Sequence, residues 1–340
     1  MPSHTRPCGA RHRARDRRSF ARRLELPTWA LAVAVYGGWG LLTWHAATLP
    51  WWLLLPAGAW MIAWHMSLQH EVIHGHPTRS RRINDAIGFP PLSLWLPYAV
   101  YRESHLAHHR DQHLTDPLED PESRYLTAEQ WAALGPVRRA LTQANATLAG
   151  RVTLGPALAI GGFLRDQAAR LAGRDRPVWR VWLTHGIGVA AVVGWVSGVC
   201  GLPLWEYALL FVYPGCGLAL VRSFAEHRAA DRVEHRTAIV EGAPLLSLLF
   251  LNNNLHVVHH QRPGLPWYAI PAVYRQRRDA LIAGNGGLVY RGYADVARRF
   301  LLTPHDSLLH PEHHSRTKSK VVASRAQEPE FSDAHAGLVG

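Results

Sequence analysis

Four apolar segments interrupt an otherwise polar chain, and each has about the length that crosses a lipid bilayer. They cover residues 26–47, 51–69, 178–201 and 202–221 and contain almost no charged side chains. A helix needs about twenty apolar residues to span the roughly 30 Å hydrocarbon layer. Tryptophans gather toward the ends of these segments, as in the aromatic belt of membrane proteins. The pattern predicts an all-α integral membrane protein with four transmembrane helices; buried helices of a large soluble protein are the alternative.

Short connections join the four segments into two hairpins. Residues 48–50 connect the first pair and residues 200–203 the second. The chain before the first segment is rich in arginine, and positively charged flanks stay in the cytoplasm. Each hairpin returns the chain to the cytoplasm, so we expect both termini on that side of a bacterial-type inner membrane. Residues 70–109 and those after residue 221 are expected there too, as a cytoplasmic, histidine-rich helical cap.

The polar parts of the chain indicate how it is organised. We expect residues 1–25 to form a basic cytoplasmic segment, residues 26–310 the membrane domain, and residues 311–340 a polar, disordered tail. Residues 124–176 have helical patterning and are assigned to cytoplasmic or interfacial helices. The formal net charge of +12 is concentrated in arginines near the N-terminus and around Arg79. Without a nucleic-acid-binding module, this charge favours anionic membrane lipid over nucleic acid as the partner.

Histidine clusters lie beside the apolar segments. Three of them have regular spacings: H-E-x-x-H-G-H from residue 70, and H-x-x-H-H from residues 105 and 256. A helix turns about 100° per residue, so the first two histidines of the first cluster lie on one face of a helix. In each of the other clusters the three rings cover an arc of roughly 100°. Imidazole is a common ligand of iron, zinc and copper, so the clusters predict a metal site.

The number of rings bears on the identity of the metal. The sequence H-E-x-x-H alone is also the zinc metalloprotease signature, in which the glutamate acts as a base. A catalytic zinc needs three protein ligands and an open position, whereas the clusters offer about eight imidazoles and the chain has only 3 cysteines. This surplus predicts two metal ions. Two ions rich in nitrogen ligands suit an oxygen-activating iron pair better than a hydrolytic zinc.

The three clusters, in this order and beside apolar helices, resemble the histidine boxes of the integral-membrane fatty acid desaturases and of the related hydroxylases and carotenoid ketolases. The resemblance covers about residues 51–268. It implies a non-haem centre of two iron ions, which uses dioxygen as co-substrate and external electrons to remove hydrogens from an alkyl chain. Matched residue by residue, it assigns as iron ligands His70, His74, His105, His108, His109, His256, His259 and His260.

The resemblance also points to ligands outside the boxes. His227 follows an apolar segment and matches an additional histidine that desaturases carry at such a place. Ser223 stands one turn earlier, where some members have an asparagine that holds a metal-bound water. His76 belongs to the H-E-x-x-H-G-H form of the first box, but Gly75 and Pro77 should end the helix there. Further candidates for holding the water are Asn252, Asn253 and Asn254, and candidates for orienting a ligand ring are His113 and Glu226.

The resemblance implies desaturation of the alkyl or acyl chain of a lipid or lipid-like substrate, with hydroxylation or ketolation as the alternative. The cysteines are too scattered for an iron–sulfur cluster, so we expect electrons from a separate donor of ferredoxin, rubredoxin or cytochrome b5 type. A metal-binding membrane protein without turnover stays as a further alternative. The acidic residues 116–122 are interpreted as helix caps or partners of arginines rather than ligands, because the imidazoles suffice.

Overall fold

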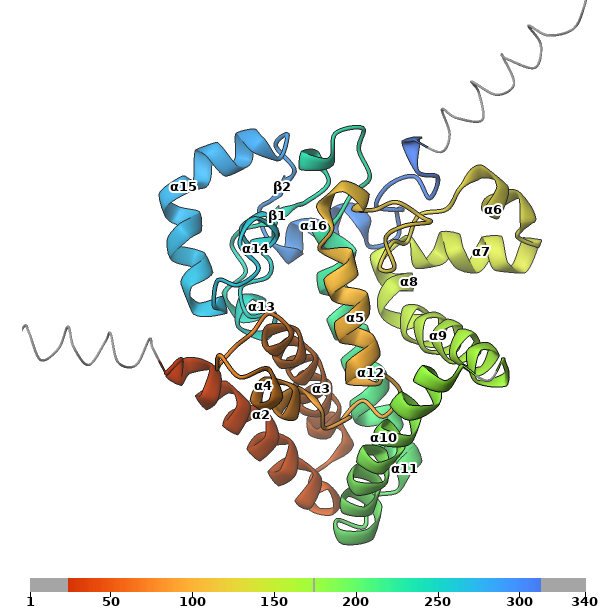
Figure 1. Cartoon of the computed structure of the whole chain (residues 1–340), viewed down its shortest axis with the longest axis vertical. Helices are drawn as coiled ribbons and strands as arrows, with labels where there is room; N and C mark the ends of the chain where they lie inside the picture. The colour runs from red at the N-terminus through yellow and green to blue at the C-terminus, as the bar shows by residue number, and fades with distance from the viewer. Residues whose placement is uncertain (1–23, 174, 313–340) are drawn as a thin grey trace, which may run out of the picture.

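The computed structural model describes residues 24–173 and 175–312, which are mostly helical (Figure 1). Almost all of the predicted basic segment 1–25 and of the predicted tail 311–340 lies outside these residues. In the described part, strands are limited to β1 (Ile239–Val240) and β2 (Val289–Tyr290). The prediction of a mostly helical protein is therefore confirmed.

Two long helical hairpins form the lower part of the molecule in Figure 1. The first hairpin consists of α2 (Leu26–Trp44) and α3 (Trp51–Ile73), which the short 3-10 turn η1 (Ala46–Thr48) connects. Pro50 is the N-cap residue of α3 and has an extended conformation. The predicted short connection between the first two apolar segments is thus confirmed.

In the second hairpin, a descending and an ascending helical stretch follow one another. The descending stretch is α10 (Arg176–Val193) with the π-helical turn η3 (Gly194–Val199). The ascending stretch is made of α11 (Leu204–Tyr207), the π-helical turn η4 (Ala208–Val212) and α12 (Tyr213–Glu226). The turns of both hairpins lie at the lower end of the molecule (Figure 1). All four stretches therefore place their other ends toward the same part of the structure.

Three helical stretches in the described residues are long and apolar enough to cross a membrane: Leu26–Trp44, Arg176–Val199 and Leu204–Glu226. They expose large apolar side chains such as Trp44, Leu183 and Leu209. The remaining predicted span lies in α3, which is not among them. The second half of α3 lowers its hydropathy, because it contains several polar residues. These residues, all buried, are His65, Ser67, Gln69, His70 and Glu71. Because α3 packs against α2, η4 and α12, it is the central helix of the bundle.

Glycine and proline set the ends of the histidine-bearing helices. α3 ends at Ile73, and Gly75 follows with a φ of 97°, a left-handed conformation that favours glycine. The predicted break after the first box is therefore confirmed. The chain continues through α4 (Arg81–Gly88) to Pro97, directly after which α5 (Tyr98–His108) begins and carries the second box.

Helices also fill the region between the second box and the second hairpin. After the turn η2 (Asp111–His113), an acidic loop leads to this region. Its helices are α6 (Ala128–Ala133), α7 (Pro136–Asn145), α8 (Leu148–Thr153) and α9 (Gly155–Ala172). The helical pattern predicted for residues 124–176 is confirmed. Because α8 and α9 both pack against α12, this region forms one flank of the site described below.

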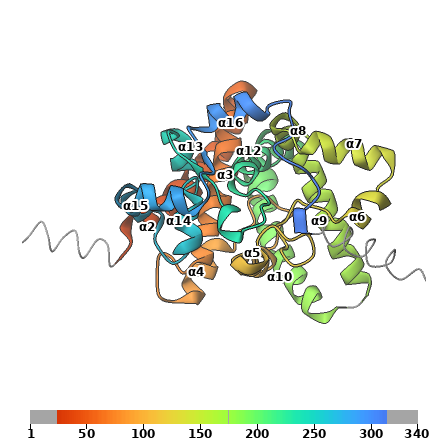
Figure 2. The same ribbon diagram turned by 90° about the horizontal axis from the view of Figure 1, so that it is seen from above.

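The chain after α12 covers the upper end of α3 in Figure 1. It contains η5 (Val233–His235), α13 (Pro244–Leu249), α14 (His256–Gln261), η6 (Trp267–Ala269), α15 (Ile270–Gly284) and α16 (Tyr293–Phe300). β1 and β2 pair in parallel, with Ile239 opposite Val289 and Val240 opposite Tyr290. From above, α14 and α15 lie on one side of α3, and α6, α7 and α9 lie on the other (Figure 2).

Candidate metal centre

Nine histidine rings converge from α3, α5, α14 and the C-terminal end of α12. They form two groups, and within each group the potential ligand nitrogens all lie within 4.8 Å of one another. The first group consists of His70, His74, His105, His109 and His259. The second consists of His108, His227, His256 and His260. The structure therefore brings together the eight box histidines assigned as ligands and His227.

In the first group, ring nitrogens face one another across short distances. Nε2 of His105 lies 2.9 Å from Nε2 of His74 and 3.0 Å from Nε2 of His109. Nε2 of His109 in turn lies 3.1 Å from Nε2 of His259. The Nε2 atom of His70 is buried and has no hydrogen-bond partner among the described residues. A buried polar atom without a partner costs free energy unless a ligand satisfies it, so this atom favours an ion among the five rings.

In the second group, the outer nitrogen of each of three rings faces an oxygen. Nδ1 of His108 lies 2.9 Å from Asp120 Oδ1, and Nδ1 of His227 lies 3.3 Å from the Arg236 carbonyl oxygen. Nδ1 of His256 lies 3.2 Å from Glu226 Oε1, an ion-pair distance without the geometry of a hydrogen bond. Since an oxygen acceptor calls for a proton on Nδ1, a neutral ring of His108 or His227 has a lone pair on Nε2.

The Nε2 atoms of these three rings lie close together. Nε2 of His227 lies 3.1 Å from that of His108 and 3.0 Å from that of His256. Lone pairs at such distances repel, and a proton shared by two of the nitrogens leaves the third unsatisfied. A cation in their midst satisfies all three. The residues present therefore fit a metal ion bound by imidazole nitrogen.

Neighbouring histidines of a box belong to different groups. His108 and His109 follow one another in the chain, as do His259 and His260, yet each pair is divided between the groups. The rotation of about 100° per residue aims consecutive side chains in different directions and accounts for the division. The spacing H-x-x-H-H thus lets one short helix supply ligands to two sites that lie side by side.

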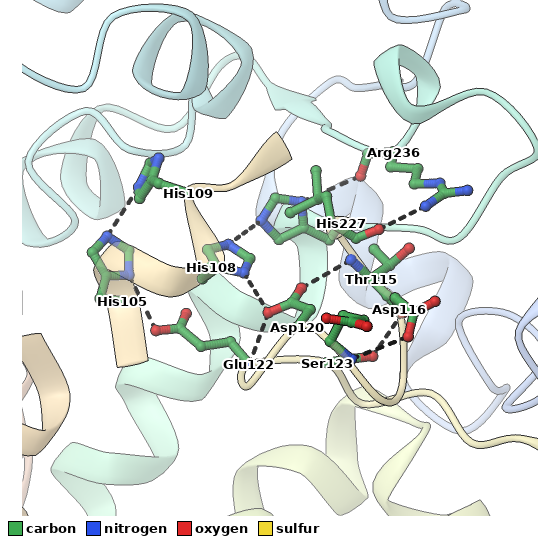
Figure 3. A network of polar contacts seen from close by, with 12 residues as sticks. His105, His108, His109, Thr115, Asp116, Asp120, Glu122, Ser123, His227 and Arg236 are labelled. Carbon is green, nitrogen blue, oxygen red and sulfur yellow. Dashed lines mark hydrogen bonds and ion pairs between the residues drawn. The ribbon is translucent and has the colours of Figure 1, made fainter. Parts of the chain in front are cut away.

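A loop after the second box returns to α5 and places two carboxylates behind the rings (Figure 3). Asp120 accepts a hydrogen bond from His108 Nδ1, and its other oxygen accepts one from the Thr115 amide at 2.8 Å. Glu122 Oε1 lies 3.1 Å from Nδ1 of His105. Carboxylates in this position fix the orientation of a ligand ring and increase its basicity.

Burial keeps several of the rings neutral. Burial and the neighbouring rings hold the pKa of His256 and of His259 well below the usual range, so both are in the form that binds a metal. His108 differs: although burial opposes protonation, Glu122 and Asp120 raise its pKa to about 9. The same carboxylates would stabilise a cation bound at Nε2, because their negative charge favours positive charge on or beside the ring.

The geometry agrees with the comparison of the chain with known protein families. A family model described as fatty acid desaturase matches residues 46–293, which is most of the chain. The chain belongs to the fatty acid desaturase family. Comparison with curated proteins finds no match. All three histidine boxes and His227 lie within the matched residues, so both groups of rings are in the part of the chain that matches the family model.

The other candidates from the sequence lie outside both groups. His113 is half-buried, and its Nε2 lies 3.1 Å from the side-chain nitrogen of Gln112. Asn254 donates to the Val240 carbonyl at 2.7 Å. Ser223 is exposed and donates to the Leu220 carbonyl at 3.3 Å. Glu226 also lies outside both groups, but it is close to a ring of the second group, His256, as expected of a carboxylate that orients a ligand ring.

Sequence reasoning missed two carboxylates that contact the rings. The acidic loop was expected to cap helices or pair with arginines, which is wrong for Asp120 and Glu122 because both contact histidines. Asp116 does cap a turn, since it accepts from the amides of Leu118 and Glu119. Asn253, which the sequence offered as a candidate for holding a water, has its side-chain amide 3.2 Å from His70 Nδ1. Metal-bound histidines in proteins generally have a polar partner, often a carboxylate, at the second ring nitrogen. This general rule could have identified the acidic loop after the second box as a source of such partners.

We expect His76 and His227 to differ in their effect on metal content. His76 Nδ1 lies 2.9 Å from the carboxylate of Glu25, and its Nε2 lies 3.9 Å from Glu71, so the ring is held outside both groups. His227→Ala should therefore lower bound iron and eliminate turnover together, whereas His76→Ala should leave most of the iron in place. Metal analysis of the two purified variants beside the wild type tests this. Full iron content in the His227 variant would remove that ring from the coordination sphere.

Proposed function

We propose that the protein is a membrane di-iron, dioxygen-dependent oxidoreductase that desaturates the alkyl or acyl chain of a lipid or lipid-like substrate. The observation that carries this proposal is the pair of adjacent all-histidine groups, whose Nε2 atoms converge while oxygens face the outer nitrogens. Two ions held mainly by imidazole, beside one another and buried, suit oxygen chemistry better than hydrolysis. Membership of the desaturase family supports the same assignment.

In this proposal each group of rings holds one iron. The bound irons would supply the reaction in which dioxygen, two electrons and two protons take two hydrogens from neighbouring methylenes, leaving an alkene and two waters. Asp120, Glu122 and Glu226 hold His108, His105 and His256 in their orientations. Asn253 does the same for His70. Fixed ligand rings hold the reactive centre at a constant place relative to the bound chain, as positioning of a specific C–H bond requires.

A cavity beside the second group offers room for the substrate. Its volume is about 610 Å³, and His108 and His227 line it. Trp95, Phe163 and Leu220 line the same cavity and provide apolar contacts for an alkyl chain. A methylene held by these residues would lie beside the second group of rings.

A hydroxylase or ketolase is the second candidate, since the same ligand set serves these activities in the family. The two outcomes differ in the product, because loss of a second hydrogen gives an alkene and transfer of oxygen gives an alcohol. The protein would receive its electrons from a separate carrier of ferredoxin, rubredoxin or cytochrome b5 type. An inactive metal-binding membrane protein would show neither product.

The proposal is tested by turnover in a reconstituted system. The full chain in lipid nanodiscs would be supplied with reduced ferredoxin, extracted bacterial lipid and fatty acid, and dioxygen. We expect dioxygen uptake that depends on the donor, and new alkenes in the lipid fraction by mass spectrometry. His108→Ala is the matched control, and it should consume no dioxygen. Alcohols in place of alkenes would favour the hydroxylase, and the absence of any donor-dependent uptake would contradict an oxygen-dependent enzyme.

The proposed topology has four membrane spans, with α3 as one of them, and a cytoplasmic histidine-rich cap. It follows from the short hairpin connections and the arginine-rich start of the chain. Ser80 and Gly264 are exposed at the end where the boxes lie, and Thr48 is exposed at a hairpin turn. In a cysteine-free background, Ser80→Cys and Gly264→Cys should react with an impermeant maleimide only from the cytoplasmic side. Thr48→Cys should react only from the outer side; the reverse pattern would contradict the proposed orientation.

A further inference from the structure

The cavity beside the second group is not only apolar. It lies between α5, the acidic loop, α8 and α9, and the end of α12, and three arginines line it together with His108 and His227. The arginines are Arg124, Arg151 and Arg222. Buried cations in such a place need partners, because removing charge from water is costly.

Two of the three arginines form ion pairs with carboxylates of the protein. Arg124 Nη2 forms an ion pair with Asp306 at 3.0 Å and donates to the His227 carbonyl at 3.2 Å. Arg222 Nε forms an ion pair with Glu226 at 3.2 Å, although its Nη1 atom is buried without a hydrogen-bond partner among the described residues. Both guanidinium groups therefore have a structural role at the end of α12, where His227 lies.

Arg151 has no such partner. Its side chain makes no hydrogen bond or ion pair with any residue in the described part of the chain, and its Nε atom is buried. Burial and the nearby Arg124 lower the pKa of Arg151 to about 10, although Asp306 and Tyr125 act in the opposite direction, so the guanidinium is still charged at neutral pH. The fold thus holds an unpaired cation at the wall of the cavity, which is unfavourable unless a ligand relieves it.

The acidic side chains of the cavity do not supply the missing partner. Asp120 contacts His108, Glu122 contacts His105, and Glu226 contacts Arg222 and His256. Asp166 forms an ion pair with the exposed Arg165 at 2.9 Å. None of these carboxylates forms an ion pair with Arg151.

We propose that Arg151 binds an anionic group of the substrate, a carboxylate or a phosphate, in the same cavity that His108 and His227 line. This inference rests on the proposed function and narrows it. The substrate is an amphiphile whose anionic end contacts Arg151 and whose alkyl part contacts Trp95, Phe163 and Leu220. A guanidinium forms paired hydrogen bonds with either anion, which a neutral ester or alcohol cannot match.

Binding of photoreactive dodecanoic acid tests the inference without requiring turnover. The acid would carry a diazirine at its methyl end, and labelling of the full chain in phosphatidylcholine nanodiscs would be measured with unlabelled competitors. We expect laurate or lauryl phosphate to compete at least about tenfold better than methyl laurate, the size expected for losing a charged hydrogen bond. Stronger competition by laurate identifies a carboxylate, and stronger competition by lauryl phosphate identifies a phosphate. Equal competition by anions and methyl ester would overturn the inference.

Substitutions locate the effect at Arg151. Arg151→Met retains an unbranched apolar side chain of similar length up to Nε and removes the charge, so the preferred anion should compete about tenfold more weakly while the methyl ester is unchanged. Arg151→Lys should retain part of the preference, and Arg165→Met, an exposed arginine on α9, should retain all of it. Wild-type affinity for the anion in Arg151→Met would overturn the assignment. The comparison of acid with ester in the wild type decides the matter even if a variant fails to fold.

The same preparations separate this inference from the proposed function. Iron content and the preference for an anion are measured on one sample. A preference for the anion in a protein that binds no iron would contradict the oxidoreductase and still support the anion site. Equal binding of acid and ester by a protein that holds iron would overturn the anion site alone.

Discussion

Removing one ring from the second group is expected to release one metal ion, whereas removing one ring from the first group should release less. His256→Ala leaves three rings in its group, and His74→Ala leaves four in the other. His256→Ala removes one of the four protein ligands of the second group. His74→Ala removes one of the five ligands of the first group, and the four that remain equal the number in the intact second group. We therefore expect iron to fall from about two to about one per chain in His256→Ala, and to fall less in His74→Ala.

Both substitutions should nevertheless abolish turnover, because the reaction needs both ions at fixed places. Elemental analysis and product formation on the same purified samples measure the two effects. His45→Ala is the matched control, since His45 is exposed at the end of α2 and lies outside both groups. Equal loss of both ions in His256→Ala would mean that the ions bind as one cooperative unit, and no loss would contradict the assignment of the second group.

Replacing Asp120 with asparagine should reduce activity by about 10- to 100-fold, the usual effect of losing a carboxylate behind a metal-bound histidine. Asp120 is buried, and its two oxygens accept from His108 and from the amides of Thr115 and Glu122. The asparagine has nearly the same shape but no negative charge. It weakens the orientation of the His108 ring and the stabilisation of positive charge at its Nε2 atom.

The matched control is Asp116→Asn on the same loop. Asp116 caps a turn through the amides of Leu118 and Glu119 and does not belong to either group of rings. Its substitution should leave turnover within about twofold of the wild type, as for most changes at half-exposed positions. Full activity and full iron content in Asp120→Asn would show that the carboxylate does not support the site.

The sequence predicted the helices and the histidines well because both depend on local spacing. The helical period places His70 and His74 on one face, and apolar runs of fixed length predict the long helices. How the nine rings divide into two groups was not predictable, since it depends on how α5 and α14 face one another across α3. The division of His108 from His109 is clear only once both helices are in place.

Features that depend on the return of a loop were missed for the same reason. Asp120 and Glu122 contact α5 only because the loop after the second box folds back onto it. The β1–β2 pair joins segments far apart in the chain and is too short to leave a pattern. The unpaired charge of Arg151 likewise depends on the packing of α8 against α12, which no spacing in the sequence indicates.

The central claim is that the two groups of histidines bind a pair of irons, and metal analysis of the purified full chain tests it most directly. Protein produced in iron-supplemented cells and purified in detergent should contain about two iron ions per chain and little zinc. His227→Ala and His256→Ala purified in parallel should contain less iron than the wild type. One zinc per chain without iron would contradict the claim and favour a hydrolytic site at the first box.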